Sequence, residues 1–78
     1  MANKLLGDYK TQRDGGLIYF YEAMWLRRGT DVLWRAKVRL KTRHAGDIEG
    51  RIVNAPSDEE ISPLVEAQIA SDIENKIR

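Results

Sequence analysis

The sequence predicts an α+β domain: a three-stranded, possibly four-stranded, antiparallel β-meander followed by one C-terminal amphipathic helix. Two patterns lead to this prediction. Residues 32–43 alternate apolar and basic side chains, which is typical of a strand with one buried face. Near the C-terminus, isoleucine or valine recurs at every fourth position, which is typical of a helix with one buried stripe. We expect this helix to pack on one face of the sheet.

The length and composition indicate one small domain. The 78 residues include no cysteine, so neither a disulfide nor a thiolate metal site can stabilise the core. A chain this short buries only about 60% of its unfolded surface, and oligomerisation is one way to bury more. The N-terminus lacks the apolar core of a signal peptide, and no apolar run approaches the roughly 20 residues that span a bilayer. We therefore expect a cytoplasmic protein that does not bind membranes.

Charge is distributed unevenly along the chain, although 13 basic and 12 acidic residues leave a net charge of only +1. Residues 1–54 carry 11 basic and 6 acidic side chains, a net charge of +5. Residues 55–78 carry 2 basic and 6 acidic side chains, a net charge of −4. Such asymmetry can indicate a nucleic-acid-binding surface, but the basic excess is modest.

We divide the chain into a weakly patterned N-terminal segment, residues 1–16, and a single domain at residues 17–78. The segment ends in an Asp-Gly-Gly turn signal at residues 14–16. Residues 9–13 would form a short edge strand that leads into this turn. A frayed terminus explains the same pattern equally well.

Residues 17–27 and 32–43 predict a β-hairpin that closes through a tight turn at residues 28–31. An even-length loop pairs residues whose numbers add up to 59, which brings Trp25 opposite Trp34 on the apolar face. A one-residue slip would move a glutamate onto that face, so the pattern itself selects the register. We expect the tryptophan pair to serve packing. The predicted core face of the hairpin consists of Tyr19, Tyr21, Ala23, Trp25, Val32, Trp34, Val38 and Leu40.

A third strand is predicted to follow a three-residue turn at residues 45–47, in which the glycine would supply a positive φ. This turn places Ile48 and Ile52 on the core face beside Leu40. The strand is expected to end near Val53, because an Asn-Ala-Pro sequence follows it.

The C-terminal helix is predicted to begin with Ser62 as its N-cap and Pro63 at its first position, where a missing N–H costs nothing. A capping box that begins at Ser57 would leave Pro63 too far inside the helix. The buried stripe of this helix consists of Ile61, Val65, Ile69, Ile73 and Ile77.

The other face of the hairpin combines basic and large apolar side chains, and we select it as a candidate interaction surface. Its residues are Phe20, Met24, Leu26, Arg35, Lys37, Arg39, Lys41 and Arg43. Three interpretations are open, in descending order of preference. Long basic side chains cover their apolar neighbours on a solvated face, the patch contacts a protein or a second copy, or its cations bind phosphates while Phe20 stacks on a base.

No catalytic residue, metal ligand, cofactor site or small-molecule site is predicted. The lone His44 falls in a predicted turn, and the chain has no cysteine for it to activate. Consecutive carboxylates at residues 58–60 are expected to complement the helix dipole rather than bind a cation. They would also repel phosphate, and residues 34–40 lack the glycine- and aromatic-rich signature of RNA-recognition motifs.

These observations favour a small non-catalytic protein-interaction module. We expect it to bind a protein partner or a second copy through the outer face or an open strand edge. The alternative is sequence-tolerant binding of nucleic acid through the basic strand at Arg35–Arg43.

Overall fold

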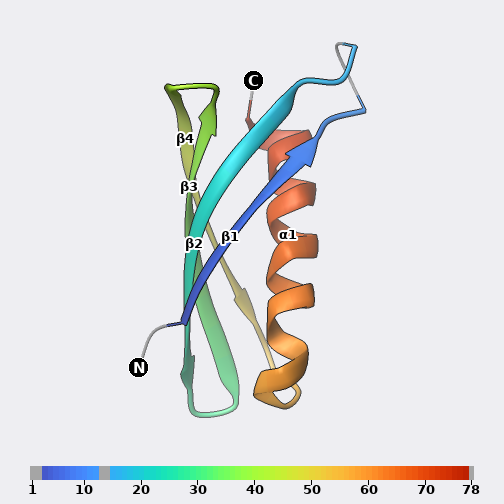
Figure 1. Cartoon of the computed structure of the whole chain (residues 1–78). Coiled ribbons are helices and arrows are strands. Elements are labelled where there is room, and N and C mark those ends of the chain that lie inside the picture. Colours follow the sequence, from blue (N-terminus) through green and yellow to red (C-terminus); the bar gives the residue numbers. More distant parts are fainter. Residues whose placement is uncertain (1–2, 13–14, 78) are drawn as a thin grey trace.

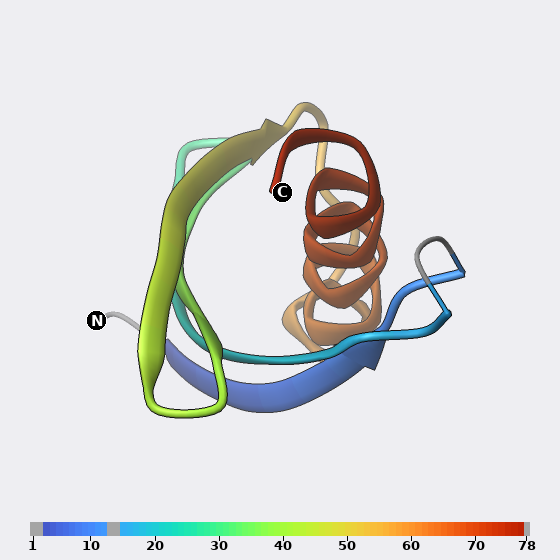
Figure 2. The same ribbon diagram turned by 90° about the horizontal axis from the view of Figure 1, so that it is seen from above.

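A computed structural model describes residues 3–12 and 15–77. Its elements in chain order are β1 (Asn3–Lys10), β2 (Ile18–Arg28), β3 (Asp31–Leu40), β4 (Arg43–Ile52), the short 3₁₀ helix η1 (Asp58–Glu60) and α1 (Ile61–Lys76). The four strands form one antiparallel sheet in the order β1-β2-β3-β4, and the helix follows it. The sheet curls around α1, so the helix lies on its concave side (Figures 1 and 2). The predicted α+β class is confirmed, in its four-stranded form.

The central hairpin has the predicted register. Trp25 lies opposite Trp34, and Glu22 lies opposite Lys37. The two-residue turn contains Gly29 with a φ of +64°, a conformation that glycine adopts at little cost. The tryptophans are 5% and 3% exposed, so their assignment to the core is confirmed.

The core lies between the concave face of the sheet and one stripe of α1. All five predicted stripe residues are buried, and the stripe prediction is confirmed. On the sheet side, the buried residues are Tyr19, Tyr21, Ala23, Trp25, Val32, Trp34, Ala36, Val38, Ile48 and Ile52. Leu40 is only half-buried at the end of β3. The indole Nε1 of Trp34 donates a hydrogen bond of 2.6 Å to Oε1 of Gln68, which joins the sheet to the helix.

The N-terminal edge strand lies earlier in the chain than expected. It spans Asn3–Lys10 instead of residues 9–13, and Arg13 lies outside the described residues. Its pattern is weak because an edge strand buries little and one of its core-facing positions is Gly7. The ring of Tyr21 lies over this glycine, and a Cβ there would overlap the tyrosine hydroxyl. Gly7 therefore interrupts the apolar alternation for a packing reason.

The predicted turn at residues 45–47 is wrong. The chain already reverses at Lys41 and Thr42, where Lys41 has a φ of +60°. β4 therefore begins at Arg43. Near its start the pairing with β3 shifts, because Val38 lies opposite Gly46 whereas Arg39 lies opposite His44.

This early turn changes the partners of β4 but not its buried face. Ile48 lies opposite Ala36 and Ile52 opposite Val32, and both isoleucines are buried as expected. Gly46 serves close packing rather than a turn, because its Cβ would lie 2.7 Å from Cδ1 of Ile77.

The helix begins earlier than the predicted Ser62 cap. It starts at Ile61, directly after η1, so Pro63 is the third helical residue. This position costs no hydrogen bond, because the first four N–H groups of a helix have no intrahelical partner. Asp58 in η1 accepts a 2.9 Å hydrogen bond from Nε of Arg27, which fixes the helix start to the hairpin.

Candidate interaction surface

The sheet face turned away from α1, here called the outer face, carries six of the eight predicted surface residues. These are Phe20, Met24 and Leu26 on β2 and Arg35, Lys37 and Arg39 on β3. Lys41 lies in the turn between β3 and β4 instead. Arg43 lies on β4 opposite Leu40, so it belongs to the concave face of the sheet, as Leu40 does. The basic strand is therefore shorter than predicted, because the chain reverses before its alternation ends.

Strands β1 and β4 complete the outer face with residues that the sequence did not single out. β1 adds Lys4, Leu6 and Asp8, which lie opposite Met24, Glu22 and Phe20. β4 adds Asp47, Glu49 and Arg51, which lie opposite Lys37, Arg35 and Leu33. Sequence patterns could not assign these residues to the outer face, because that assignment depends on the bounds and register of β1 and β4. Both strands begin earlier in the chain than predicted.

The outer face has two chemically different halves. The apolar half lies over β1 and β2 and carries the exposed apolar residues Leu6, Ile18, Phe20, Met24 and Leu26, with Lys4, Asp8 and Glu22 between them. Its members range from 39% exposed for Leu26 to 68% for Leu6. The charged half lies over β3 and β4 and consists of Arg35, Lys37, Arg39, Asp47 and Glu49. Among the described residues, the other exposed large apolar side chains are Leu17, Val53 and Leu64.

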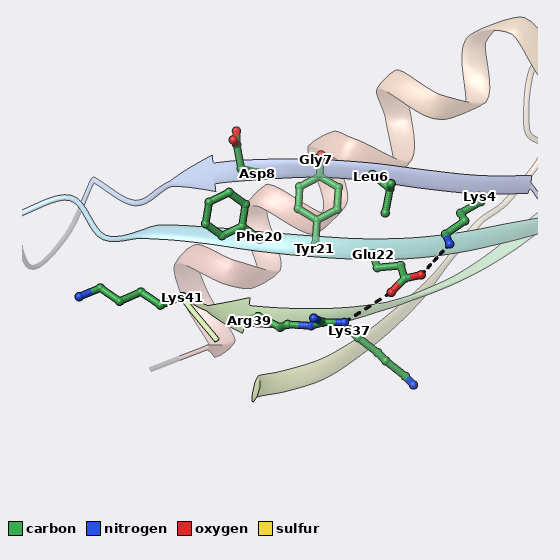
Figure 3. Close-up of a pocket in the computed structure, with 10 residues that line it drawn as sticks. All are labelled: Lys4, Leu6, Gly7, Asp8, Phe20, Tyr21, Glu22, Lys37, Arg39 and Lys41. Carbon is green, nitrogen blue, oxygen red and sulfur yellow. Dashed lines mark ion pairs between the residues drawn. The ribbon is translucent and has the colours of Figure 1, made fainter. Parts of the chain in front are cut away.

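Glu22 lies where the two halves meet. Its carboxylate is 2.9 Å from Nζ of Lys4 and 3.7 Å from Nη2 of Arg39 (Figure 3). The hydrogen bond and charge of Lys4, with the positive charges of Arg39 and Lys37, lower the pKa of this carboxyl. A shallow hollow of about 660 Å³ surrounds it, and Leu6 and Phe20 line its apolar side.

Acidic neighbours offset much of the positive charge on β3. Lys37 has Glu22 on one side and Asp47 on the other, and Arg35 lies opposite Glu49. Within residues 3–12 and 15–77, neither Arg35 nor Lys37 forms an ion pair. The outer face is therefore mixed in charge rather than uniformly basic.

A groove of about 480 Å³ separates β1 from α1 on the concave side. The helix lines it with Pro63, Glu66, Ala67 and Ala70, and the strands contribute Asp8, Tyr9 and Tyr21. Burial, followed by the nearby Glu66 and Asp8 carboxylates, raises the pKa of the Tyr21 hydroxyl. Near the end of β1, the Tyr9 hydroxyl donates a 2.9 Å hydrogen bond to Oε1 of Glu74.

His44 lies in β4 rather than in a turn, with Nε2 3.6 Å from Oδ1 of Asp47, and its side chain is 58% exposed. In the part of the chain that the structure describes, no group of three or more histidine, aspartate or glutamate side chains is placed to hold a metal ion. No helix among these residues is long and apolar enough to cross a bilayer.

No protein-family model, curated protein or solved structure matches this chain. The geometry and chemistry of the outer face and its edges are therefore the features that indicate a function.

Proposed function

We propose that this chain is a small non-catalytic protein-interaction module, acting in the cytoplasm, that self-associates through the apolar half of its outer face and the strand edge beside it. The observation that carries the proposal is the gathering of five exposed large apolar side chains over β1 and β2. Large apolar side chains that gather on one exposed face often mark a contact surface. The charged half beside it resembles the polar rim that surrounds the apolar centre of protein interfaces.

A second copy of the chain is the partner that these observations favour. A domain of 78 residues without cysteine has a small core, and association is a common way for such domains to gain buried surface. The outer face also carries both signs of charge at close spacing, so one copy can supply the counter-charges for the other.

Sedimentation equilibrium of the wild type and two matched variants tests this proposal. Leu6→Glu puts a charge into the apolar half, whereas Val53→Glu makes the same change at a residue outside it. The two sites are 68% and 64% exposed, so the loss of exposed apolar surface is similar. We expect a wild-type dimer whose population rises with concentration, its loss in Leu6→Glu and its retention in Val53→Glu. A wild type that stays monomeric up to about millimolar concentration, the weak end of specific association, would refute the proposal.

Binding of nucleic acid is the alternative, and one observation favours it. Arg35 and Lys37 form no ion pair among the described residues, which leaves their charges available for phosphates. Labelled single- and double-stranded nucleic acid of mixed sequence, titrated at low and physiological salt, tests it. Affinity that falls with a slope of about −0.9 per neutralised phosphate on duplex would support this function. No binding at low salt would exclude it.

A further inference from the structure

We infer that two copies of the chain join edge to edge, with β1 of one copy pairing antiparallel with β1 of the other about a two-fold axis at Leu6. This inference rests on the proposed self-association and specifies its contact. The two four-stranded sheets would then continue into each other, with both helices on the same side. Four features of the structure carry the argument: the edges, the register, the groove beside β1 and the apolar half.

The two edges of the sheet are protected to different degrees. Within the described residues, both β1 and β4 have one side on which no other strand pairs with the backbone. β4 carries only polar side chains on its outer face, namely His44, Asp47, Glu49 and Arg51. Charged side chains are a common device that keeps an edge strand from pairing. β1 also carries Lys4, Asp8 and Lys10 on this face, but its centre is the apolar Leu6, which is 68% exposed.

The alternation of side chains restricts how two copies of β1 can pair. In an antiparallel pair, residues directly opposite each other have numbers with a constant sum. Only an even sum keeps outer-face residues opposite outer-face residues, because side chains alternate with period two. An odd sum would bring the half-buried Leu5 of one copy opposite the exposed Asp8 of the other.

Among the even registers, the one centred on Leu6 is the most complementary. It brings Leu6 opposite Leu6 of the second copy, and Lys4 opposite Asp8 of the second copy on both sides of the axis. A centre at Gly7 would oppose Lys4 and Lys10, a centre at Leu5 would oppose Lys4 and Leu6, and a centre at Lys4 or Asp8 would oppose like charges directly. A centre at Tyr9 would oppose Asp8 and Lys10 but would pair only residues 8–10 of β1. Opposite charges and apolar pairs stabilise directly facing strand positions, and like charges destabilise them.

The groove between β1 and α1 lies beside the edge that the incoming strand would pair with. In the Leu6-centred register, core-facing Leu5 of the second copy lies opposite Gly7, where it would pack beside the Tyr21 ring that covers this glycine. The helix wall beside it consists of the short side chains of Pro63, Ala67 and Ala70 together with Glu66, and the groove holds about 480 Å³. The C-terminal end of β1 approaches α1 while its beginning lies away from the helix (Figures 1 and 2).

This arrangement uses the apolar half in a specific way. Edge pairing covers Leu6 and brings the apolar halves of the two copies next to each other as one band. Phe20 and Met24, which lie one strand further in, stay exposed. Stacking of two outer faces would instead cover Phe20 and Met24. The two modes of self-association can therefore be separated by experiment.

Charge reversal provides the first test, with sedimentation equilibrium as the measurement. Lys4→Glu and Asp8→Lys each replace two attractive contacts with two repulsive ones, so we expect each protein alone to dissociate at least tenfold more readily. An equal mixture restores both attractions, and we expect a heterodimer with about wild-type affinity. Lys10→Glu reverses a charge outside the paired residues 3–9 and should not affect the dimer. Asp8→Lys leaves the ion pair of Lys4 with Glu22 intact, which separates the contact from the fold.

Disulfide formation provides the second test, since the chain has no native cysteine. Directly opposed antiparallel residues have Cα atoms about 4.5–5.5 Å apart, within the range that a disulfide spans. We expect mild oxidation to cross-link the Leu6→Cys protein and leave the Phe20→Cys protein uncross-linked. Cross-linking through Phe20→Cys alone, in a dimer that tolerates both charge reversals, would overturn edge pairing while self-association stands. A wild type without any dimer would overturn both.

Discussion

Gly50 in β4 provides a sharp test of how the core is packed. It lies opposite Trp34, and a Cβ at this position would lie 2.7 Å from Cε2, Cζ2 and Nε1 of the indole. Gly50→Ala therefore requires the indole or the strand to move. The indole is 3% exposed and is held by a 2.6 Å hydrogen bond to Gln68, so it has little freedom to do so.

The expected loss of stability follows from three contributions. Overpacking of a filled core costs about 1–3 kcal/mol. Displacement of the indole weakens its hydrogen bond to Gln68, a net loss of about 0.5–1.5 kcal/mol. Removing a flexible glycine from a strand returns about 0.5–1 kcal/mol. We therefore expect Gly50→Ala to lower the free energy of unfolding by about 0.5–4 kcal/mol, out of a total of about 4–12 kcal/mol for a domain of this size.

Urea denaturation followed by circular dichroism measures this loss, and indole fluorescence reports the surroundings of the tryptophans. Trp34→Leu on the Gly50→Ala background is the control for the mechanism, because a smaller side chain removes the overlap. The double variant should then lose less stability than the sum of the two single losses. A neutral or stabilising Gly50→Ala would refute the packing of Trp34 over this glycine.

Two further predictions concern the buried stripe of α1 and Tyr21, whose ring lies over Gly7 of β1. Ile69→Ala should lower the free energy of unfolding by about 2–5 kcal/mol because Ile69 is fully buried, whereas Leu64→Ala on the exposed flank should cost much less. Equal losses in urea denaturation would contradict the helix orientation. Because the folded-state pKa of Tyr21 is raised, its stabilising contribution is complete below the unfolded pKa of about 10 and falls as pH rises above it. Tyr21→Phe should therefore reduce the fall in the free energy of unfolding above about pH 10. An unchanged pH dependence would contradict the raised pKa of Tyr21.

Local patterns in the sequence were sufficient for the central hairpin and the helix stripe. A one-residue slip between β2 and β3 would move apolar side chains out of the core, so the alternation in the two strands selects the register in which Trp25 lies opposite Trp34. The helix stripe is equally direct, because residues four apart lie on one face whatever the helix packs against. Six of the eight candidate surface residues followed from the same register.

Only the tertiary structure decided the outer strands and the two ends of the candidate surface. Gly46 was predicted to form a turn, and no role was predicted for Gly7 or Gly50. In the structure, Tyr21, Ile77 and Trp34 pack closely over Gly7, Gly46 and Gly50, respectively. The turn at Lys41 uses a positive φ at a residue that carries no turn signal, which shortened the basic strand. The exposure of Leu6 at a sheet edge, which makes it the centre of the proposed contact, follows from the position of β1 in the sheet. In each case the deciding interaction is long-range, and a local pattern contains no record of it.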